Sequence, residues 1–97
     1  MATLVLAAHA WADEESTSIS KPFFGCTDLT AFKDGLRLLK ETDIVAFKKL
    51  IRERGCHEFN KGEKTFRRQL SEDALYACIR PEGEPDCFWT LPDLTTK

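Results

Sequence analysis

The stretch Tyr76–Thr90 reads YACIRPEGEPDCFWT, and it holds two short runs of strand-forming residues around a Pro-Glu-Gly-Glu centre. This pattern predicts a β-hairpin, because a turn sequence separates two segments that favour strands. A cysteine lies on each side of the turn, and we expect Cys78 to face Cys87 across the hairpin. The other pairs in this register are Tyr76 with Trp89 and Arg80 with Pro85.

Alternation along the two strands divides the predicted hairpin into two faces. The aliphatic face holds Leu75, Ala77, Ile79 and Phe88, and the aromatic, disulfide-bearing face holds Tyr76, Cys78, Arg80, Cys87 and Trp89. Aromatic residues and Arg contribute much of the energy of binding interfaces, so the second face is a candidate recognition patch. The candidate ligand-binding residues are Tyr76, Arg80, Glu82, Glu84 and Trp89. The alternative is a core face covered by other elements, and we favour it for Trp89.

The chain has 97 residues, which allow one domain with a modest core, so we expect covalent cross-links to add to its stability. Its 14 basic and 16 acidic residues give a net charge of -2, and this charge provides no bulk attraction to nucleic acid or to an anionic membrane. No apolar run approaches the roughly 18 residues of a membrane-spanning helix. We therefore predict no nucleic-acid partner and no membrane span. The oligomeric state leaves no signal in the sequence.

The first twelve residues resemble the end of a secretory signal. Residues 3–12, TLVLAAHAWA, are apolar except for Thr3 and His9, and small residues lie on both sides of Trp11 before the acidic Asp13. This pattern is typical of a cleavage site, although no Lys or Arg precedes the apolar run. We predict a signal-peptide remnant over residues 1–12, a flexible leader over 13–25 and a single α+β domain over 26–97. The alternative for residues 3–12 is a strand or short helix packed on the core.

Two amphipathic helices are predicted between residues 28 and 55. Asp28 and Asp43 are favourable N-caps, and apolar residues follow each at helical spacing. The two apolar stripes are Leu29, Phe32, Leu36 and Leu39, then Ile44, Phe47, Leu50 and Ile51. Gly55 lies where a left-handed C-cap is expected. Gly35, inside the first helix, would let another backbone approach closely.

Beyond Gly55 the helical period ends, and Gly, Ser and Pro residues divide the chain into short segments. We place strands at residues 56–60, 64–70, 75–80 and 87–90, followed by a turn at Pro92–Leu94. Arg68 interrupts the apolar face of the second strand, so we expect this strand to be a sheet edge or to be strongly bent.

The four cysteines allow three disulfide pairings. Cys26 and Cys56 are equally far from residue 41, the middle of the helix connection, so an antiparallel helix pair would bring them together. Cys78 and Cys87 flank the β-turn in the same way. We predict the pairs Cys26–Cys56 and Cys78–Cys87, each closing one hairpin.

Metal binding and catalysis find little support in the sequence. Cys56 and His57 are adjacent, but structural zinc usually requires close C-x₂₋₄-C pairs, which are absent. A Cys-His nucleophile requires a free thiol, and disulfide formation removes it. We predict no metal, no cofactor and no catalytic residue.

The densest basic cluster outside the second helix could suggest a nucleic-acid platform, because two phenylalanines lie within it. It consists of Lys61, Lys64, Arg67 and Arg68, with Phe59 and Phe66. Neighbouring carboxylates dilute the charge, and we favour a solvated sheet edge.

A family resemblance covers residues 56–94. The Gly62 turn, the Ile79-Arg80 strand, the Pro-Glu-Gly turn and the closing Pro92-x-Leu94 resemble a small bacterial SH3-like barrel. The helix pair that precedes them is similar to that of short exported bacterial proteins of unassigned function. The resemblance implies a domain that binds peptides, cell-wall material or protein partners without catalysis.

We therefore predict an α+β fold in which a disulfide-closed αα-hairpin packs on a small, strongly bent antiparallel, SH3-like sheet. The predicted protein is exported to the periplasm or the exterior, is not an enzyme, and binds a protein or a cell-envelope component. One alternative is a secreted inhibitor or immunity-type protein, for which the acidic turn at residues 82–86 would be suitable. A second alternative is a small hydrolase.

Overall fold

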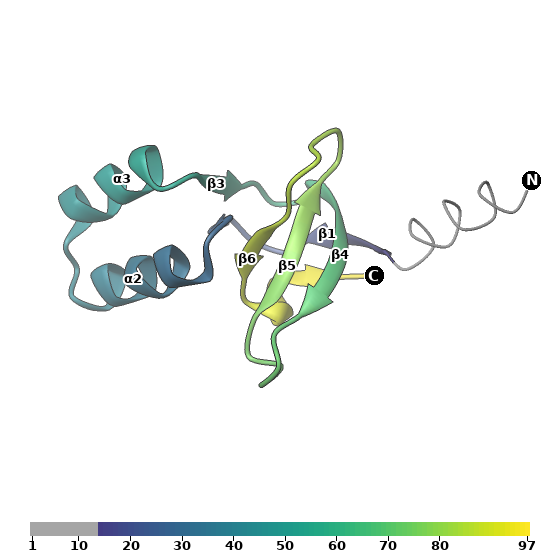
Figure 1. Ribbon diagram of the computed structural model, residues 1–97. Helices are drawn as coiled ribbons and strands as arrows, with labels where there is room; N and C mark the ends of the chain where they lie inside the picture. Colours follow the sequence, from purple (N-terminus) through teal and green to yellow (C-terminus); the bar gives the residue numbers. More distant parts are fainter. Residues whose placement is uncertain (1–13) are drawn as a thin grey trace, which may run out of the picture.

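The computed structural model describes residues 14–97, in which two helices pack on a strongly curled antiparallel sheet of seven strands (Figure 1). The helices are α2 (Leu29–Lys40) and α3 (Ile44–Glu53). The strands are β1 (Glu15–Ile19), β2 (Phe23–Cys26), β3 (Cys56–Phe59), β4 (Lys64–Leu70), β5 (Ala77–Pro81), β6 (Phe88–Thr90) and β7 (Thr95–Thr96). A 3₁₀ turn at Pro92–Leu94 precedes β7. The strand order is β3-β2-β6-β5-β4-β1-β7, so the fold is α+β.

Strand β1 and most of β2 lie in residues 13–25, so the prediction of a flexible leader there is corrected. β1 is held between β4 and β7 by antiparallel pairing. Thr17 is buried in β1, and its hydroxyl forms a hydrogen bond of 2.8 Å with that of buried Thr65. The polar composition concealed this strand because the two hydroxyl groups satisfy each other inside the fold. The predicted signal-peptide remnant at residues 1–12 lies outside the described residues.

Both predicted helices are confirmed, and their starts follow from the capping residues. The Asp28 carboxylate accepts a hydrogen bond from the backbone N–H of Thr30, and that of Asp43 accepts one from Ala46, each at 3.1 Å. Gly55 follows α3 with a φ of 65°, which suits glycine.

The curled sheet separates two hydrophobic clusters. The inner cluster, within the curl, consists of Ile19, Phe59, Ala77, Ile79 and Leu94. The helix-side cluster, between the sheet and the helices, consists of Phe24, Cys26, Ala31, Phe32 and Leu50. Phe23 packs against both clusters, so β2 links the two halves of the core.

Both predicted disulfides are present, but the first has a different structural role from the one predicted. Cys26 of β2 and Cys56 of β3 are direct partners in the antiparallel ladder, with Cα atoms 4.0 Å apart. The bond therefore links two strands, and the helical hairpin leaves from one strand and returns to the other (Figure 1). The prediction of a disulfide-closed αα-hairpin is wrong in this respect, because each cysteine belongs to a strand that flanks the helices. The second bond joins β5 to the residue before β6.

The β5–β6 hairpin is confirmed with a register that differs from the prediction by two residues. Cys78 pairs with Trp89 and Ile79 pairs with Phe88, so Cys87 lies diagonally from Cys78. As direct partners in the ladder, the predicted pairs Cys78–Cys87, Tyr76–Trp89 and Arg80–Pro85 are wrong, although the Cys78–Cys87 disulfide itself is present. A shift of two residues preserves the faces, because side chains alternate with a period of two.

Strand β4 lies inside the sheet, between β5 and β1, so the prediction of an edge strand is wrong. The predicted bend is confirmed: the pairing of β4 with β5 shifts register between Arg67 and Gln69, which makes Arg68 the extra residue of a β-bulge. In the described sheet the outermost strands are β3 and β7.

Candidate binding groove

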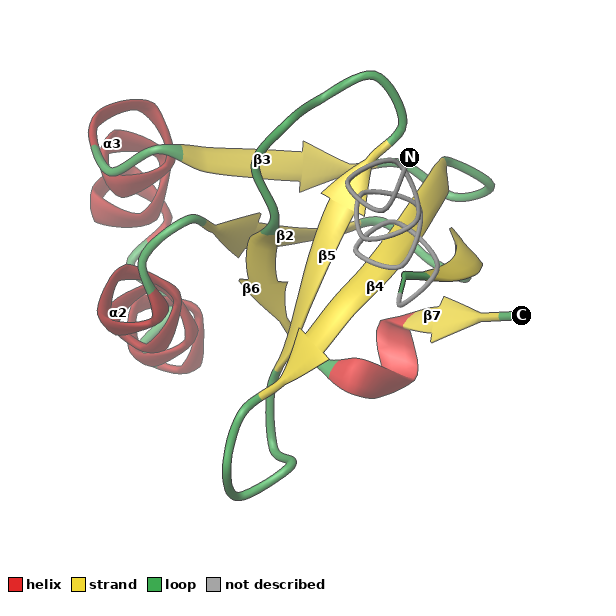
Figure 2. Cartoon of the chain, turned by 45° about the vertical axis from the view of Figure 1, so that its right-hand side comes forward, coloured by secondary structure: helices red, strands yellow, loops and turns green. Residues whose placement is uncertain are grey.

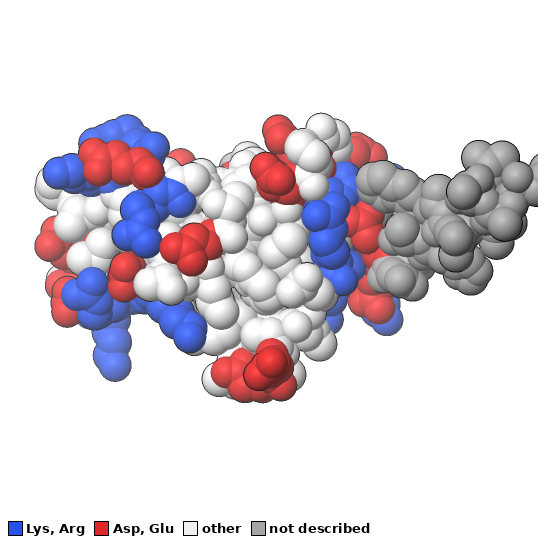
Figure 3. All heavy atoms as spheres, viewed as in Figure 1, with Lys and Arg blue, Asp and Glu red and all other residues white. Residues whose placement is uncertain are grey.

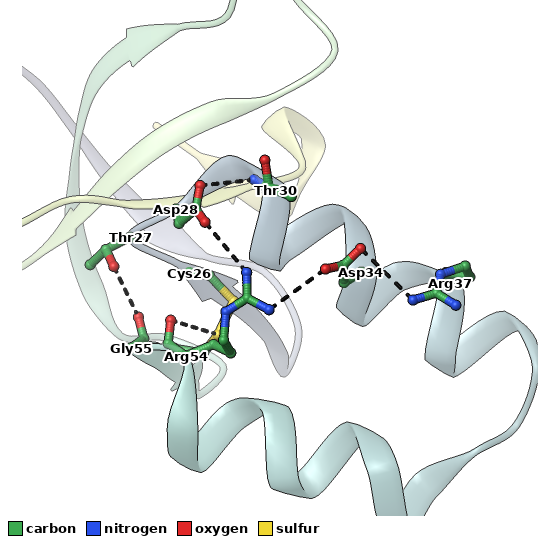
Figure 4. Close-up of polar contacts among 9 residues, drawn as sticks. Cys26, Thr27, Asp28, Thr30, Asp34, Arg37, Arg54 and Gly55 are labelled. Atoms are coloured by element: carbon green, nitrogen blue, oxygen red, sulfur yellow. Dashed lines mark hydrogen bonds and ion pairs between the residues drawn. A yellow bond between two sulfur atoms is a disulfide. The ribbon is translucent and has the colours of Figure 1, made fainter.

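Polar contacts fix the helix pair where it joins the sheet (Figure 4). The Arg54 guanidinium lies 3.5 Å from the Asp28 carboxylate and 3.7 Å from that of Asp34, so it connects the end of α3 to α2. The Thr27 backbone N–H donates to the Gly55 carbonyl at 3.2 Å, next to the Cys26–Cys56 disulfide. Exposed ion pairs contribute little stability. The disulfide and the backbone hydrogen bond therefore fix the two ends of the helical insertion beside each other, and the helix-side cluster packs the helices on the sheet.

A groove of about 360 Å³ opens between the helix pair and the strands β2 and β3. Its lining residues are apolar except for Glu58 and Asn60. It is lined by Pro22, Phe23, Phe24, Leu39, Phe47, Glu58, Phe59 and Asn60, and we call it the phenylalanine groove. Such an apolar hollow with few polar groups is typical of binding sites.

Close aromatic packing fixes the groove wall formed by Phe24. Its ring centroid lies 4.9 Å from those of Phe32 and Phe47, and the Phe47 ring stands edge-on to it. On the α2 side, a Cβ placed on Gly35 would lie 2.6 Å from the Phe24 ring. The close approach at Gly35 is thus made by this ring and not by another backbone, as the sequence had led us to expect. The wall has little room to rearrange, so the groove is largely preformed.

A second hollow, of about 220 Å³, lies next to the phenylalanine groove, and Glu58 lines both. Its other lining residues are Lys48, Ile51 and Arg52, all on α3. Within residues 14–97 no ion pair involves Lys48, Arg52 or Glu58. In Figure 3 Lys and Arg side chains lie over the helix pair, interspersed with Asp and Glu side chains. Two of the three charged residues that line this second hollow are basic, so it has a net charge of +1.

Tyr76 and Trp89, two of the predicted ligand-binding residues, lie against the helix-side cluster. Trp89 is half-buried and pairs with Cys26 on one side and Cys78 on the other. The Tyr76 ring stands edge-on to Phe32 with centroids 5.9 Å apart, and the Lys33 ammonium lies 5.3 Å from its centre. Trp89 thus packs against the core, which is the alternative that we favoured for it.

Arg80 lies in a different environment, an ion pair with Glu14. Its guanidinium donates to both carboxylate oxygens of Glu14, at 2.9 and 3.0 Å, and Arg68 donates to the same carboxylate at 3.1 Å. The Glu14 side chain is 8% exposed, and the Arg80 guanidinium lies over the Phe66 ring. The hydrogen bond from Arg80 lowers the pKa of the Glu14 carboxyl from its ordinary value, although burial opposes the change.

Glu82 and Glu84 lie in the exposed β5–β6 turn. The Glu82 carboxylate is 3.5 Å from the Lys64 ammonium, and the Glu84 carbonyl accepts a hydrogen bond from Arg80 at 3.1 Å. The structure thus brings Arg80 close to this turn, while Tyr76 and Trp89 lie against the helix-side cluster. The five predicted residues do not line one hollow.

Sequence reasoning missed the phenylalanine groove and also Glu14. The signal available for the groove was the Phe23-Phe24 pair, two adjacent aromatic residues in a segment assigned to a leader. Glu14 gave no signal, because its partners lie 54 and 66 residues further along the chain.

The remaining ionisable candidates have structural partners. His57 forms a hydrogen bond of 2.9 Å with the Glu63 carboxylate, and its ring packs against Phe59 and Phe88. All four cysteines are in disulfides. In residues 14–97 no three His, Cys, Asp or Glu side chains gather in a way that could hold a metal ion.

Comparisons of the chain with protein-family models, with curated proteins and with solved structures find no match. No helix within residues 14–97 has the length and apolar character needed to cross a membrane. The inference of function therefore depends on the groove.

Proposed function

We propose that this protein is an exported, non-catalytic binding module that recognises a protein or a cell-envelope component through the phenylalanine groove. The observation that carries the proposal is the groove of about 360 Å³, whose aromatic wall is fixed by packing on a disulfide-linked pair of strands. A preformed apolar site binds well because little ordering is required when the ligand arrives.

Two further features support the proposal. The curled antiparallel sheet agrees with the resemblance to bacterial SH3-like barrels, which commonly bind peptides, wall material or proteins. Such fold analogy is a weaker argument than the groove itself. The two disulfides support export, because such bonds persist mainly in oxidising compartments.

The groove offers little for the hydrolase alternative. A hydrolase of the nucleophilic kind requires a nucleophile beside a base. Among residues 14–97 the only ionisable side chain that lines the groove is Glu58, which is exposed. Binding is therefore the function that the groove supports best.

The proposal is tested by titrating the oxidised, isotope-labelled protein with N-acetyl-tryptophanamide, a neutral aromatic probe, and following backbone amide signals by NMR. We expect a dissociation constant on the order of 1 mM, with shifts at Phe23, Leu39, Phe47 and Asn60. Asn60→Trp should fill the mouth of the groove and abolish these shifts. Glu72→Trp, on an exposed turn outside the groove, is the matched control. Shifts scattered over the surface, or equal shifts in Asn60→Trp, would contradict the proposal.

A further inference from the structure

We infer that the ligand of the phenylalanine groove is an extended acidic peptide that adds as a further strand to β3. The inference rests on the proposed function and names the chemistry of its ligand. It depends on three observations: the outer position of β3, the α3 face that lies beside it, and the cations on that face.

Strand β3 can accept a new strand because it lies at one end of the described sheet (Figure 2). Cys26 and Cys56 have Cα atoms 4.0 Å apart, which is the short spacing of a non-hydrogen-bonded antiparallel pair. Pairs of this kind alternate along a ladder, and Glu58 with Phe24 is the next one. The backbone N–H and C=O groups of Cys56 and Glu58 therefore point away from β2. Groups in this position are those that strand-adding peptides pair with.

One face of α3 lies beside this edge. Phe47 and Ile51 are four residues apart, as are Lys48 and Arg52, so the two pairs form neighbouring rows on the helix. Phe47 lines the phenylalanine groove, whereas Lys48, Ile51 and Arg52 line the adjoining hollow. Alternate side chains of an added strand point to one face of the sheet. On the helix side they would meet an apolar groove, two cations and the Glu58 carboxylate.

Charge determines the class of peptide. Lys48 and Arg52 have no carboxylate partner within residues 14–97, although Arg37, Arg54 and Arg80 do. They line the hollow beside the groove together with one carboxylate, that of Glu58, so this hollow has a net charge of +1 although the chain as a whole has a net charge of -2. A peptide with carboxylates beside its apolar side chains complements them.

A second copy of this chain fits the edge less well. Antiparallel pairing of two β3 strands would bring Lys48 and Arg52 of both copies close together, and like charges at an interface are unfavourable. The acidic β5–β6 turn of another copy supplies carboxylates, but Pro85 is its only apolar side chain. We therefore assign the site to a separate acidic peptide.

The experiment compares two peptides on the oxidised full-length protein. The probes are acetyl-Glu-Phe-Asp-Phe-Glu-amide and acetyl-Lys-Phe-Lys-Phe-Lys-amide, titrated by NMR. We expect the acidic peptide to bind about tenfold more tightly. N-methylation of its backbone should remove the gain, because strand addition requires its N–H groups.

A matched pair of variants tests the charge. Lys48→Glu should weaken binding of the acidic peptide about fivefold. Lys49→Glu makes the same change in net charge at an exposed neighbour that does not line either hollow beside β3, and it should change binding less than about twofold.

Several results would overturn the inference while N-acetyl-tryptophanamide still binds the groove. These are equal affinity for the two peptides, full affinity of the N-methylated peptide, and a free protein that sediments as a dimer through β3. Capture by anionic lipid vesicles that depends on Lys48, without peptide binding, would also overturn it. If neither the neutral probe nor the peptides bind, the proposed function fails as well.

Discussion

The inner cluster and the helix-side cluster share strands of one sheet, yet they differ in how far their peripheral side chains are buried. All five inner residues are at most 2% exposed, and only Phe23 and Phe88 extend that cluster. The helix-side cluster continues outward through many half-buried side chains, and at Phe24 and Phe47 it reaches the open groove. The inner cluster is therefore closed more completely than the helix-side cluster, although its member Phe59 also lines the groove. The helix side keeps half-buried apolar side chains available to a ligand.

The short helices explain why the second face stays open. α2 and α3 form an insertion between β2 and β3, and they project to one side of the sheet from the ends of these strands (Figure 1). α2 packs on β2 and β6, while α3 lies near β3, so the space beside β3 is covered incompletely. Stability should therefore depend mainly on the inner cluster, and binding on the helix side.

The largest effect should come from Ile79→Ala in the inner cluster. Ile79 is fully buried in β5, so truncation should lower the free energy of unfolding by about 2 to 5 kcal/mol. Phe47→Ala, in the groove wall, should cost only about 1 to 2 kcal/mol because this side chain is half-buried. Urea denaturation under oxidising conditions measures both.

Binding separates the two variants further. Phe47→Ala should fold and lose N-acetyl-tryptophanamide binding, whereas the folded fraction of Ile79→Ala should keep it. A Phe47→Ala variant that binds normally would break the proposed division between the two faces.

Much of the helix side could be predicted from the sequence, since its signals are local. Asp28 and Asp43 mark the helix starts, and the apolar spacing marks the buried stripes. The disulfide pairing followed from symmetry about residue 41. The role of Cys26 did not, because its strand contains only four residues and two of its partners, Cys56 and Trp89, lie far along the chain.

A smaller effect is expected from Gly35→Ala. Gly35 lies against Phe24, which belongs to the helix-side cluster and also lines the groove. The new methyl group would overlap the Phe24 ring, which Phe32 and Phe47 hold in place. Overpacking costs about 1 to 3 kcal/mol, and the better helix propensity of Ala returns up to about 1 kcal/mol. We expect a net loss of about 1 to 2 kcal/mol, with weaker probe binding because the groove wall moves.

The control for Gly35→Ala is a double-mutant cycle with Phe24→Leu. The shorter side chain leaves room for the methyl group, so the double variant should lose less stability than the sum of the two single variants. Strict additivity would show that the contact between Gly35 and Phe24 does not limit packing.

The β1 side of the fold was beyond prediction for a different reason. Thr17 and Glu14 are polar residues in a segment without hydrophobic periodicity, and each is satisfied by a partner from a remote strand. The type of a residue shows which hydrogen bonds and ion pairs it can form, but it does not show which residue will be its partner. The two-residue error in the β5–β6 register has a similar origin, because the faces depend on alternation and the pairing depends on the turn.

The smallest effect, from Glu14→Gln, tests whether β1 contributes to stability without touching the groove. Arg80 lowers the pKa of Glu14 in the folded protein below the ordinary value of 4.5. The unfolded chain therefore binds the proton more readily, so the ion pair stabilises the fold above pH 4.5 and its contribution is lost as the pH falls through the folded pKa.

Glu14→Gln should lower the free energy of unfolding at pH 7 by about 1 kcal/mol, because Gln keeps one acceptor for Arg80. The difference from the unsubstituted protein should shrink as the pH falls below 4.5. Glu15→Gln, whose partner is the exposed Lys97, is the neighbouring control and should change stability little. Thermal melts from pH 3 to 7, with probe titrations at pH 7, measure these quantities. A difference that stays constant with pH, or a loss of groove binding in Glu14→Gln, would show that β1 and the helix side are coupled and that the two faces of the sheet are not independent.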